Sequence, residues 1–393
     1  MKTRTVLTLA GLAALAMLAT NILLPSLPRM GRYFGVGDSG MNAALSVFLA
    51  VFAVAQLVAG PWSDRIGRRP VIVGGMLVFL AGTLISASAT SLGLLLTGRA
   101  IQALGAAASV ALARAIARDL HSGPALARLL GLIMVVTAAA PGFSPLLGGV
   151  IDRYLGWRAV FAAVGVLGLF VAAGYLVAIG ETLPPQRRVA RSVREIATEY
   201  AALIRDPRFM VPALGVALIT GALFAVFAAS PSVLTQRFSF DAVQIGLFFS
   251  ATVFVVFAAS TAAPRLSARF GAISTFRGGL LLALAGGAIM LVAAQYTPGT
   301  LSVYVASICT FLFGMGLVTP TGTAQALTPY ASAAGQASAL LGFLQMTIAA
   351  LASSVAMGAS IDRMSALGLV LGGCAIVALL VSTNRKPAPA PAA

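Results

Sequence analysis

The run Gly60-Pro61-Trp62-Ser63-Asp64-Arg65-Ile66-Gly67-Arg68-Arg69-Pro70 separates two long apolar segments. Residues 41–60 precede it and residues 71–90 follow it, and each segment is long enough to cross the roughly 30 Å hydrocarbon core of a bilayer as a helix. The run itself holds three arginines and one aspartate, which are costly inside a bilayer. It therefore predicts two membrane-spanning helices joined by a short basic turn.

The rest of the 393-residue chain has the same apolar character. Hydrophobic residues make up 59% of it and charged residues only 9%, whereas soluble domains carry roughly 25% charged residues. The mean hydropathy is +0.98. This composition excludes a soluble enzyme, a disordered protein and a coiled coil. The apolar runs are continuous rather than alternating, which disfavours a membrane β-barrel, so we expect an all-α integral membrane protein.

Apolar runs between glycine, proline and charge clusters predict twelve membrane spans. The expected spans are 6–25, 41–60, 71–90, 92–113, 127–150, 157–180, 210–230, 243–263, 274–294, 300–320, 335–359 and 365–383. The longest polar stretch divides them, so we expect a six-helix bundle at 1–180, a cytoplasmic linker at 181–209, a second bundle at 210–384 and a disordered tail at 385–393. The first span is expected to be a retained helix rather than a cleaved signal peptide.

The two halves of the chain resemble each other in sequence. Gly74-Gly75 recurs as Gly278-Gly279, Pro25-Ser26 as Pro231-Ser232, Leu129-Leu130-Gly131 as Leu340-Leu341-Gly342, and Ile151-Asp152-Arg153 as Ile361-Asp362-Arg363. These matches occur in order at nearly constant spacing. They predict a duplicated unit, and therefore two pseudo-symmetric bundles with a substrate site between them.

The formal net charge of +16 is explained by the placement of the basic residues. If both termini are cytoplasmic, 19 of the 26 lysines and arginines fall on the cytoplasmic side, as the positive-inside rule requires. Nucleic acid is not needed as a partner. Cys309 and Cys374 lie far apart in apolar runs and His121 lies in a short polar loop, so we expect no metal site, and no P-loop pattern or other cofactor motif is present.

Three motifs carry chemistry that suits a moving membrane protein. The run at 60–70 suits a charge-paired latch in which Gly60 allows close helix approach, although a simple positive stop signal has the same composition. In the fourth span, Arg99 and Gln102 share a helical face with Gly105 one turn on, unless Arg99 merely snorkels to the surface. The fifth span contains Pro141, Gly142, Pro145, Gly148 and Gly149, which fit either a structural kink or a functional hinge.

These motifs together resemble the major facilitator superfamily, in particular its twelve-helix drug:proton antiporters and the Bcr/CflA branch. Further matching stretches are Asn21 to Pro28, Ala113 to Leu120 with Asp119, and Gly156 to Phe161. The resemblance implies a monomeric transporter of the bacterial inner membrane, not an enzyme, that exports bicyclomycin- or phenicol-type drugs in exchange for protons. It assigns gating or coupling to Gly60, Asp64, Arg65, Gly67, Arg68, Arg69, Arg99, Gln102, Gly105 and Asp119, with Asp64 facing the start of helix 11, and outward flux to the helix 5 motif.

The chain departs from the family pattern at Asn21, where relatives commonly carry an acid. An amide cannot titrate, so either a span-end acid such as Asp64 or Asp119 carries the proton or coupling differs. Substrate contacts are expected from Asn21, Phe48, Phe52, Phe224, Phe227, Tyr304 and Gln345, unless the aromatic rings only pack between helices. A pocket without acids suits neutral or weakly anionic amphiphiles. The competing functions are a sugar or organic-acid carrier, and a membrane-embedded enzyme or receptor.

Overall fold

The structure is a computed structural model that describes residues 3–188, 192–297 and 299–383. The predicted tail at 385–393 lies outside these residues. The elements of the described residues are all helical. They are α1 (Thr3–Asn21), η1 (Leu24–Ser26), α2 (Leu27–Phe34), α3 (Asp38–Ile66), α4 (Arg68–Ala87), α5 (Leu92–Leu120), α6 (Gly123–Leu155), α7 (Trp157–Ala178), η2 (Pro185–Arg187), α8 (Val193–Arg205), α9 (Pro207–Phe238), α10 (Ala242–Phe270), α11 (Ala272–Tyr296), α12 (Leu301–Leu327), η3 (Thr328–Ala333), α13 (Ala334–Gly358) and α14 (Arg363–Thr383).

Twelve stretches of the described chain are long and apolar enough to span a membrane, which confirms the predicted number. Several helices run further than the apolar pattern suggested, because a charged end can continue a helix into water. The run at 60–70 was predicted as a turn, but α3 continues through Asp64 and Arg65 to Ile66, and only Gly67 interrupts the helices. The predicted linker also contains a helix, α8, whose first turn has a capping box between Ser192 and Glu195.

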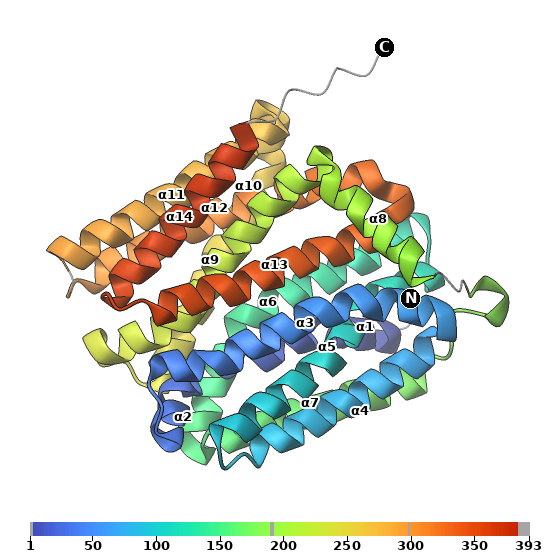
Figure 1. The fold of residues 1–393 in the computed structure, drawn as a ribbon, viewed down its shortest axis with the longest axis horizontal. Coiled ribbons are helices and arrows are strands. Elements are labelled where there is room, and N and C mark those ends of the chain that lie inside the picture. The colour runs from blue at the N-terminus through green and yellow to red at the C-terminus, as the bar shows by residue number, and fades with distance from the viewer. Residues whose placement is uncertain (1–2, 189–191, 298, 384–393) are drawn as a thin grey trace.

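The helices form two groups along the chain, α1 to α7 and α9 to α14, which lie side by side in Figure 1. Within the first group α4 packs against α5, and within the second α11 packs against α12. The two groups meet where α3 lies beside α13 and where α6 lies beside α10. These two contacts are the places at which one group can move against the other.

Glycines allow the same close helix contact in each group. A Cβ on Gly105 of α5 would lie 2.3 Å from the carbonyl oxygen of Gly75 in α4, and a Cβ on Gly314 of α12 would lie 2.4 Å from that of Gly279 in α11. Gly75 and Gly279 are members of the repeat recognised in the sequence. Small residues let helix backbones approach in a membrane, so the duplicated glycines position equivalent helix pairs.

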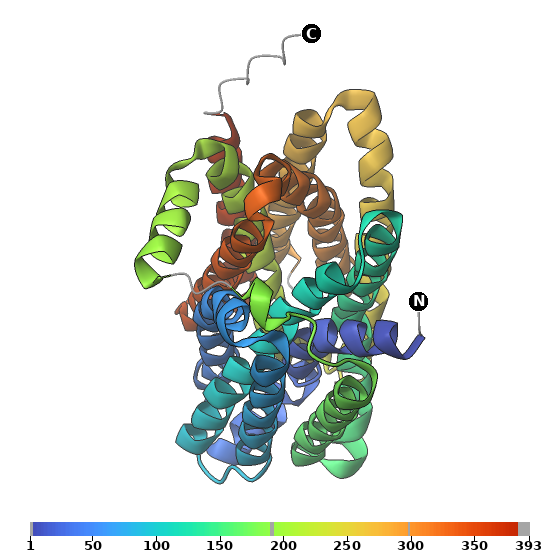
Figure 2. The same cartoon turned by 90° about the vertical axis from the view of Figure 1, so that its right-hand side faces the viewer.

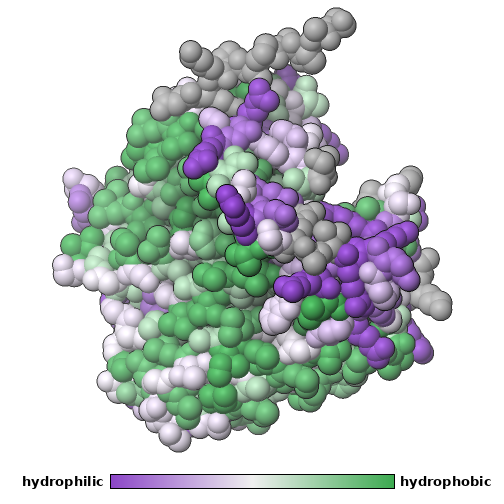
Figure 3. Space-filling view, turned by 45° about the vertical axis from the view of Figure 1, so that its right-hand side comes forward, coloured by the Kyte–Doolittle hydropathy of each residue, from purple (hydrophilic) through white to green (hydrophobic). Residues whose placement is uncertain are grey.

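An even number of spans brings both ends of the chain to one side. We call this side the terminal face; it includes the connections around Gly67, His121 and α8. The opposite side, the distal face, holds the connections at 34–38, 155–157, 238–242 and 358–363 and lies to the left in Figure 1. Figure 2 shows α8 along one margin of the terminal face, and Figure 3 shows hydrophilic residues gathered around a hollow there, beside a hydrophobic flank.

Candidate functional site

A compact ion-pair cluster joins three helix ends on the terminal face. The guanidinium of Arg68 at the start of α4 lies 2.6 Å from the carboxylate of Asp64 in α3 and 3.0 Å from that of Asp119 in α5. It also donates to the hydroxyl of Ser63 over 2.5 Å. The Arg68 side chain is only 9% exposed, so these charge-assisted bonds are largely shielded from water. The cluster holds the ends of α3, α4 and α5 together as one unit.

Gly67 and Glu181 complete this cluster from the backbone side. Gly67 has a φ of +108°, and a Cβ there would lie 2.4 Å from a carboxylate oxygen of Glu181. That carboxylate accepts the backbone N–H groups of Arg68 at 2.9 Å and Arg69 at 3.2 Å, and so caps α4. Burial alone would raise the pKa of Glu181, but the backbone N–H groups of Leu183, Arg68 and Arg69, together with the nearby Arg188, outweigh it and lower the pKa. The side chains of Arg65 and Arg69 are exposed.

We expect Gly67→Ala to destabilise the protein and Gly60→Ala to be nearly neutral. Alanine at 67 would cost about 1–3 kcal/mol for its positive φ and would also displace Glu181. Gly60 was predicted to permit a close helix approach, but a Cβ there meets no atom within 4 Å. Thermal unfolding of the two purified variants in detergent measures the difference. Equal melting temperatures would show that the backbone at Gly67 does not need glycine.

The contact predicted between Asp64 and the start of helix 11 is not made in this structure. Among the described hydrogen bonds, Asp64 is paired with Arg68, within its own group of helices. The start of α13 has two other contacts instead. Its Ser338 accepts a hydrogen bond from Arg114 of α5 over 3.1 Å, and its Gln336 donates to Glu199 of α8 over 2.6 Å. The role of Asp64 in the opposite conformation therefore stays a prediction.

Arg99 lies in the interior, so the alternative that it snorkels to the surface is wrong. Its residue is 1% exposed. The guanidinium donates to the carbonyl of Ala19 in α1 at 3.2 Å, to that of Ala44 in α3 at 3.3 Å, and to Gln102 at 2.5 Å. It also lies 4.2 Å from the ring centre of Phe48. One cation thus joins α1, α3 and α5, and its bond to Gln102 agrees with the predicted shared face.

Asn21 is the last residue of α1, two positions after Ala19, whose carbonyl Arg99 binds. The residue is fully buried, and its amide donates to the carbonyl of Met17 over 2.8 Å. Its side-chain oxygen has no hydrogen-bond partner within the described residues. Buried polar atoms are seldom left unpaired. This unpaired acceptor makes Asn21 a candidate contact for a donor group of a bound molecule.

The helix 5 motif lies where three helices approach on the distal side. A Cβ on Gly148 of α6 would lie 1.8 Å from the carbonyl oxygen of Ile22, just after α1. A Cβ on Gly149 would lie 2.2 Å from the carbonyl oxygen of Ala242, and one on Gly142 would lie 2.6 Å from Val253, both in α10 of the other group. The helix continues through Pro141 and Pro145. The motif therefore brings the two groups into backbone contact.

The predicted substrate residues are distributed between the two groups of helices. Phe48 covers Arg99 and stacks on Phe52 with ring centres 6.1 Å apart. Phe224 and Phe227 form an edge-on pair at 5.6 Å in α9. Gln345 of α13 donates to Thr220 of α9 over 3.2 Å. These residues lie on helices that face the partner group or on their immediate neighbours, and their contact with substrate remains a prediction.

Tyr304 does not fit the predicted substrate role. It is fully buried, its hydroxyl donates to Ser230 over 2.8 Å, and its ring lies 5.8 Å from that of Phe238 and 6.1 Å from that of Phe248. All these partners belong to the second group of helices. Tyr304 is therefore a packing residue of that group in this structure, because its polar and apolar surfaces are both already occupied.

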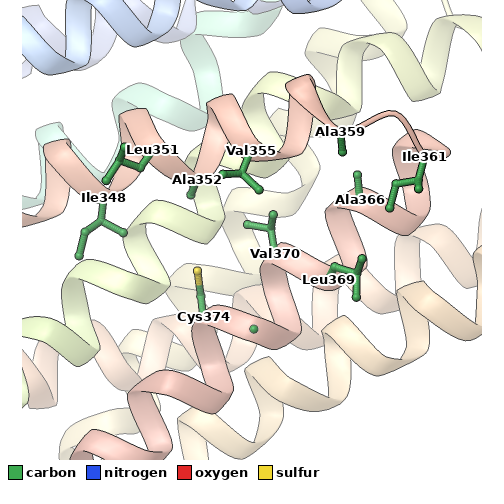
Figure 4. A pocket seen from close by; sticks show the side chains of 11 residues that line it. Ile348, Leu351, Ala352, Val355, Ala359, Ile361, Ala366, Leu369, Val370 and Cys374 are labelled. Atoms are coloured by element: carbon green, nitrogen blue, oxygen red, sulfur yellow. The ribbon is translucent and has the colours of Figure 1, made fainter.

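A groove of about 370 Å³ opens on the flank between α13 and α14. Figure 4 shows its apolar side chains from both helices facing each other, with the thiol of Cys374 among them. None of the predicted substrate residues lines it. Two of the residues that line it, Leu351 and Leu369, are themselves exposed, as expected for a region in contact with lipid.

Asp152 lies near the end of a span and is nevertheless buried. It is 3% exposed near the end of α6, and Arg29 donates to its carbonyl over 2.7 Å and lies 3.6 Å from its carboxylate. The sequence feature that singles out Asp152 is its place in the repeated Ile-Asp-Arg sequence. Glu181 was not among the predicted site residues, because no local sequence pattern indicates that it caps α4, a helix far from it in the sequence.

Two repeated groups of six spans, with buried arginines in the first group and glycine contacts between the groups, define a secondary transporter. The profile described as Major Facilitator Superfamily matches residues 9–357, and the chain belongs to this family. It is a transporter and not an enzyme. No group of three or more metal-ligating side chains occurs among the described residues.

The relatives and solved structures agree with this assignment. The chain is 28% identical over 337 residues to "Multidrug resistance protein D" of Escherichia coli, covering 85% of this chain and 83% of the relative. It is 25% identical over 375 residues to "Bicyclomycin resistance protein homolog" of Haemophilus influenzae, covering 95% and 94%. The crystal structure of the human organic anion transporter MFSD10 matches this structure with a TM-score of 0.68 and 19% identity. The match covers 96% of this chain and 99% of that chain, and it supports the twelve-helix fold.

Proposed function

We propose that this protein exports drugs or small amphipathic compounds by alternating access, in exchange for protons. The observation that carries the proposal is the similarity along nearly the whole chain to relatives named for multidrug and bicyclomycin resistance. The helix 5 glycines support it, because they bring α6 against α10 where the two groups of helices must separate. The partners are a small molecule, protons and the lipid bilayer, and we propose that the protein acts as a monomer.

The proposed orientation places the terminal face in the cytoplasm of a bacterial inner membrane. The basic residues support it, since the ends of α3, α5 and α10 and helix α8 on that face are rich in arginine. With this orientation the distal face is periplasmic. The proposed domain division is two six-helix bundles joined by the linker at 181–209.

The proposed substrates are neutral or weakly anionic amphiphiles. The acids Asp64 and Asp119 are engaged by Arg68, and the buried Asp152 lies against Arg29, so none of these three acids is free to balance a cationic drug. Arg99 instead places a positive charge inside the first group of helices. Asn21, Phe48, Phe52, Phe224, Phe227 and Gln345 remain the proposed contacts.

Export can be tested by a resistance and efflux panel in a host that lacks its own pumps. We expect resistance to bicyclomycin and phenicols but not to quaternary ammonium compounds, and loss of efflux when a protonophore is added. Efflux that survives the protonophore would contradict proton exchange while leaving export intact. Accumulation of a sugar or organic acid, with no change in drug resistance, would favour the competing uptake carrier.

We expect Asn21→Asp to make transport strongly dependent on pH. At low pH the new carboxyl is neutral, like the amide it replaces, so transport should resemble that of the wild type. At high pH it is charged, and the rate should change by up to about tenfold per pH unit, the limit for one titrating group. Drug uptake into inverted vesicles between pH 5.5 and 8.5 measures the profile.

Asn42→Asp is the matched control for this variant. Asn42 is also a buried asparagine whose side-chain oxygen has no hydrogen-bond partner within the described residues, but it belongs to α3. Drug uptake by Asn42→Asp should therefore not gain the steep pH dependence expected of Asn21→Asp. If both variants, or neither, gain a steep pH profile, position 21 has no special part in coupling.

A further inference from the structure

The repeated Ile-Asp-Arg sequence closes the distal side of both groups of helices. Its first copy ends α6, and its second lies between α13 and α14. In each copy the aspartate is bound within its own group. Asp152 lies 3.6 Å from the guanidinium of Arg29, which follows α1, and Asp362 forms an ion pair with Arg237 near the end of α9. The two acids therefore occupy equivalent places in the two repeats.

The arginine of each copy reaches into the other group. Arg153 forms an ion pair with Asp241 at 2.8 Å, where Asp241 caps the start of α10. Arg363 donates to Ser39, in the first turn of α3, over 3.2 Å. Because α3 and α10 hold the same position in the two repeats, these are the same contact made twice, in opposite directions.

Other polar contacts support the second crossing. Ser39 also donates to the carbonyl of Met357 near the end of α13 over 2.5 Å, and Arg363 donates to the same carbonyl over 2.6 Å. The neighbouring Asp38 accepts hydrogen bonds from Ser232 and, over 3.0 Å, from Gln236 in α9. The starts of α3 and α10 are thus each held by side chains or carbonyls of the opposite group.

We propose that the two Ile-Asp-Arg sequences form a two-part gate on the distal face. In each part the aspartate fixes the helix end within its group, while Arg153 or Arg363 crosses to the other group and holds the face closed. The distal face can open only when both crossings break, since α3 and α10 would move away from the arginines together with their own groups.

The strength of the crossings suits a gate that opens in every cycle. The side chains of Arg153 and Asp241 are 54% and 48% exposed, and exposed ion pairs change an equilibrium constant by only roughly twofold to fivefold. Each crossing therefore biases the distal face toward closure without locking it. If the two crossings contribute independently, loss of both should increase the fraction of open molecules by roughly fourfold to twenty-five-fold, provided the closed form predominates.

Accessibility of a seam residue to a thiol reagent tests the gate without knowledge of the substrate. In a background with Cys309→Ser and Cys374→Ser, the reporter is Ser46→Cys in α3, whose native hydroxyl lies 3.0 Å from that of Ser354 in α13. A membrane-impermeant maleimide is applied from the distal side. Arg153→Gln with Arg363→Gln should raise the labelling rate several-fold. An unchanged rate in this folded variant would overturn the proposal.

Two further variants separate gating from a general loss of structure. Arg158→Gln is the matched control, because Arg158 lies on the same face but bonds to Tyr33 and to the carbonyl of Ala89 within its own group. Its labelling rate should stay at the wild-type level, and an equal rise would refute a specific gate. Asp241→Asn keeps a side chain that can cap α10, so it should raise labelling as much as Arg153→Gln, with no further rise when both are combined. Additive effects would show that the two residues do not act through each other.

Discussion

Replacing Gly148 by alanine is expected to reduce drug transport by at least about tenfold. The added Cβ would lie 1.8 Å from the carbonyl oxygen of Ile22, a distance that no backbone can accommodate without movement. Overpacking of this kind costs typically 1–3 kcal/mol, and about 1.4 kcal/mol corresponds to a factor of ten in an equilibrium. The carbonyl belongs to main chain, so α1 and α6 must separate and the neighbouring contact between Gly149 and α10 must change.

Gly131→Ala is the control for this prediction. Gly131 lies on the same helix, α6, and a Cβ there would meet no atom within 4 Å. Efflux assays of both variants, at matched amounts of folded protein in the membrane, separate the close approach from a general effect of alanine on α6. Normal transport by Gly148→Ala would exclude the proposed role of the helix 5 motif.

The spans could be predicted because they depend on composition, whereas their exact ends could not. Apolar runs of about 20 residues identify a helix in a bilayer, but the polar end of a helix in water looks like a loop. Asp64 was therefore placed in a turn although α3 continues beyond it. A break between the two helices at Gly67 could be predicted, since a break with positive φ favours glycine.

Long-range partners were beyond what the sequence could predict. Glu181 caps α4 from a position more than a hundred residues further along the chain, and no periodicity links the two. Arg99 was correctly paired with Gln102 because both lie on one helix, but its bonds to α1 and α3 depend on packing between helices. The repeat was recognised as a duplication, while the opposite directions of Arg153 and Arg363 emerge only in three dimensions.

Arg99→Gln is expected to abolish transport while leaving the protein in the membrane. Glutamine has neither the charge nor the reach to serve the carbonyls of Ala19 and Ala44 together with the side chain of Gln102. Each buried acceptor left without a donor costs about 1–3 kcal/mol. The links between α1, α3 and α5 would be lost at the position where the bundle holds its buried cation. Efflux of the preferred drug, with size-exclusion chromatography of the purified variant, measures function and folding separately.

Arg99→Lys distinguishes the two properties that Arg99 supplies. Lysine keeps the charge inside the bundle, but its single ammonium cannot reproduce the planar fork that serves partners on three helices. Transport that is partly restored would assign the main role to charge, and transport as low as in Arg99→Gln would assign it to the geometry of the fork. If Arg99→Gln itself transports normally, Arg99 has no part in the mechanism. We expect the charge to matter, and Arg99→Lys to retain measurable efflux.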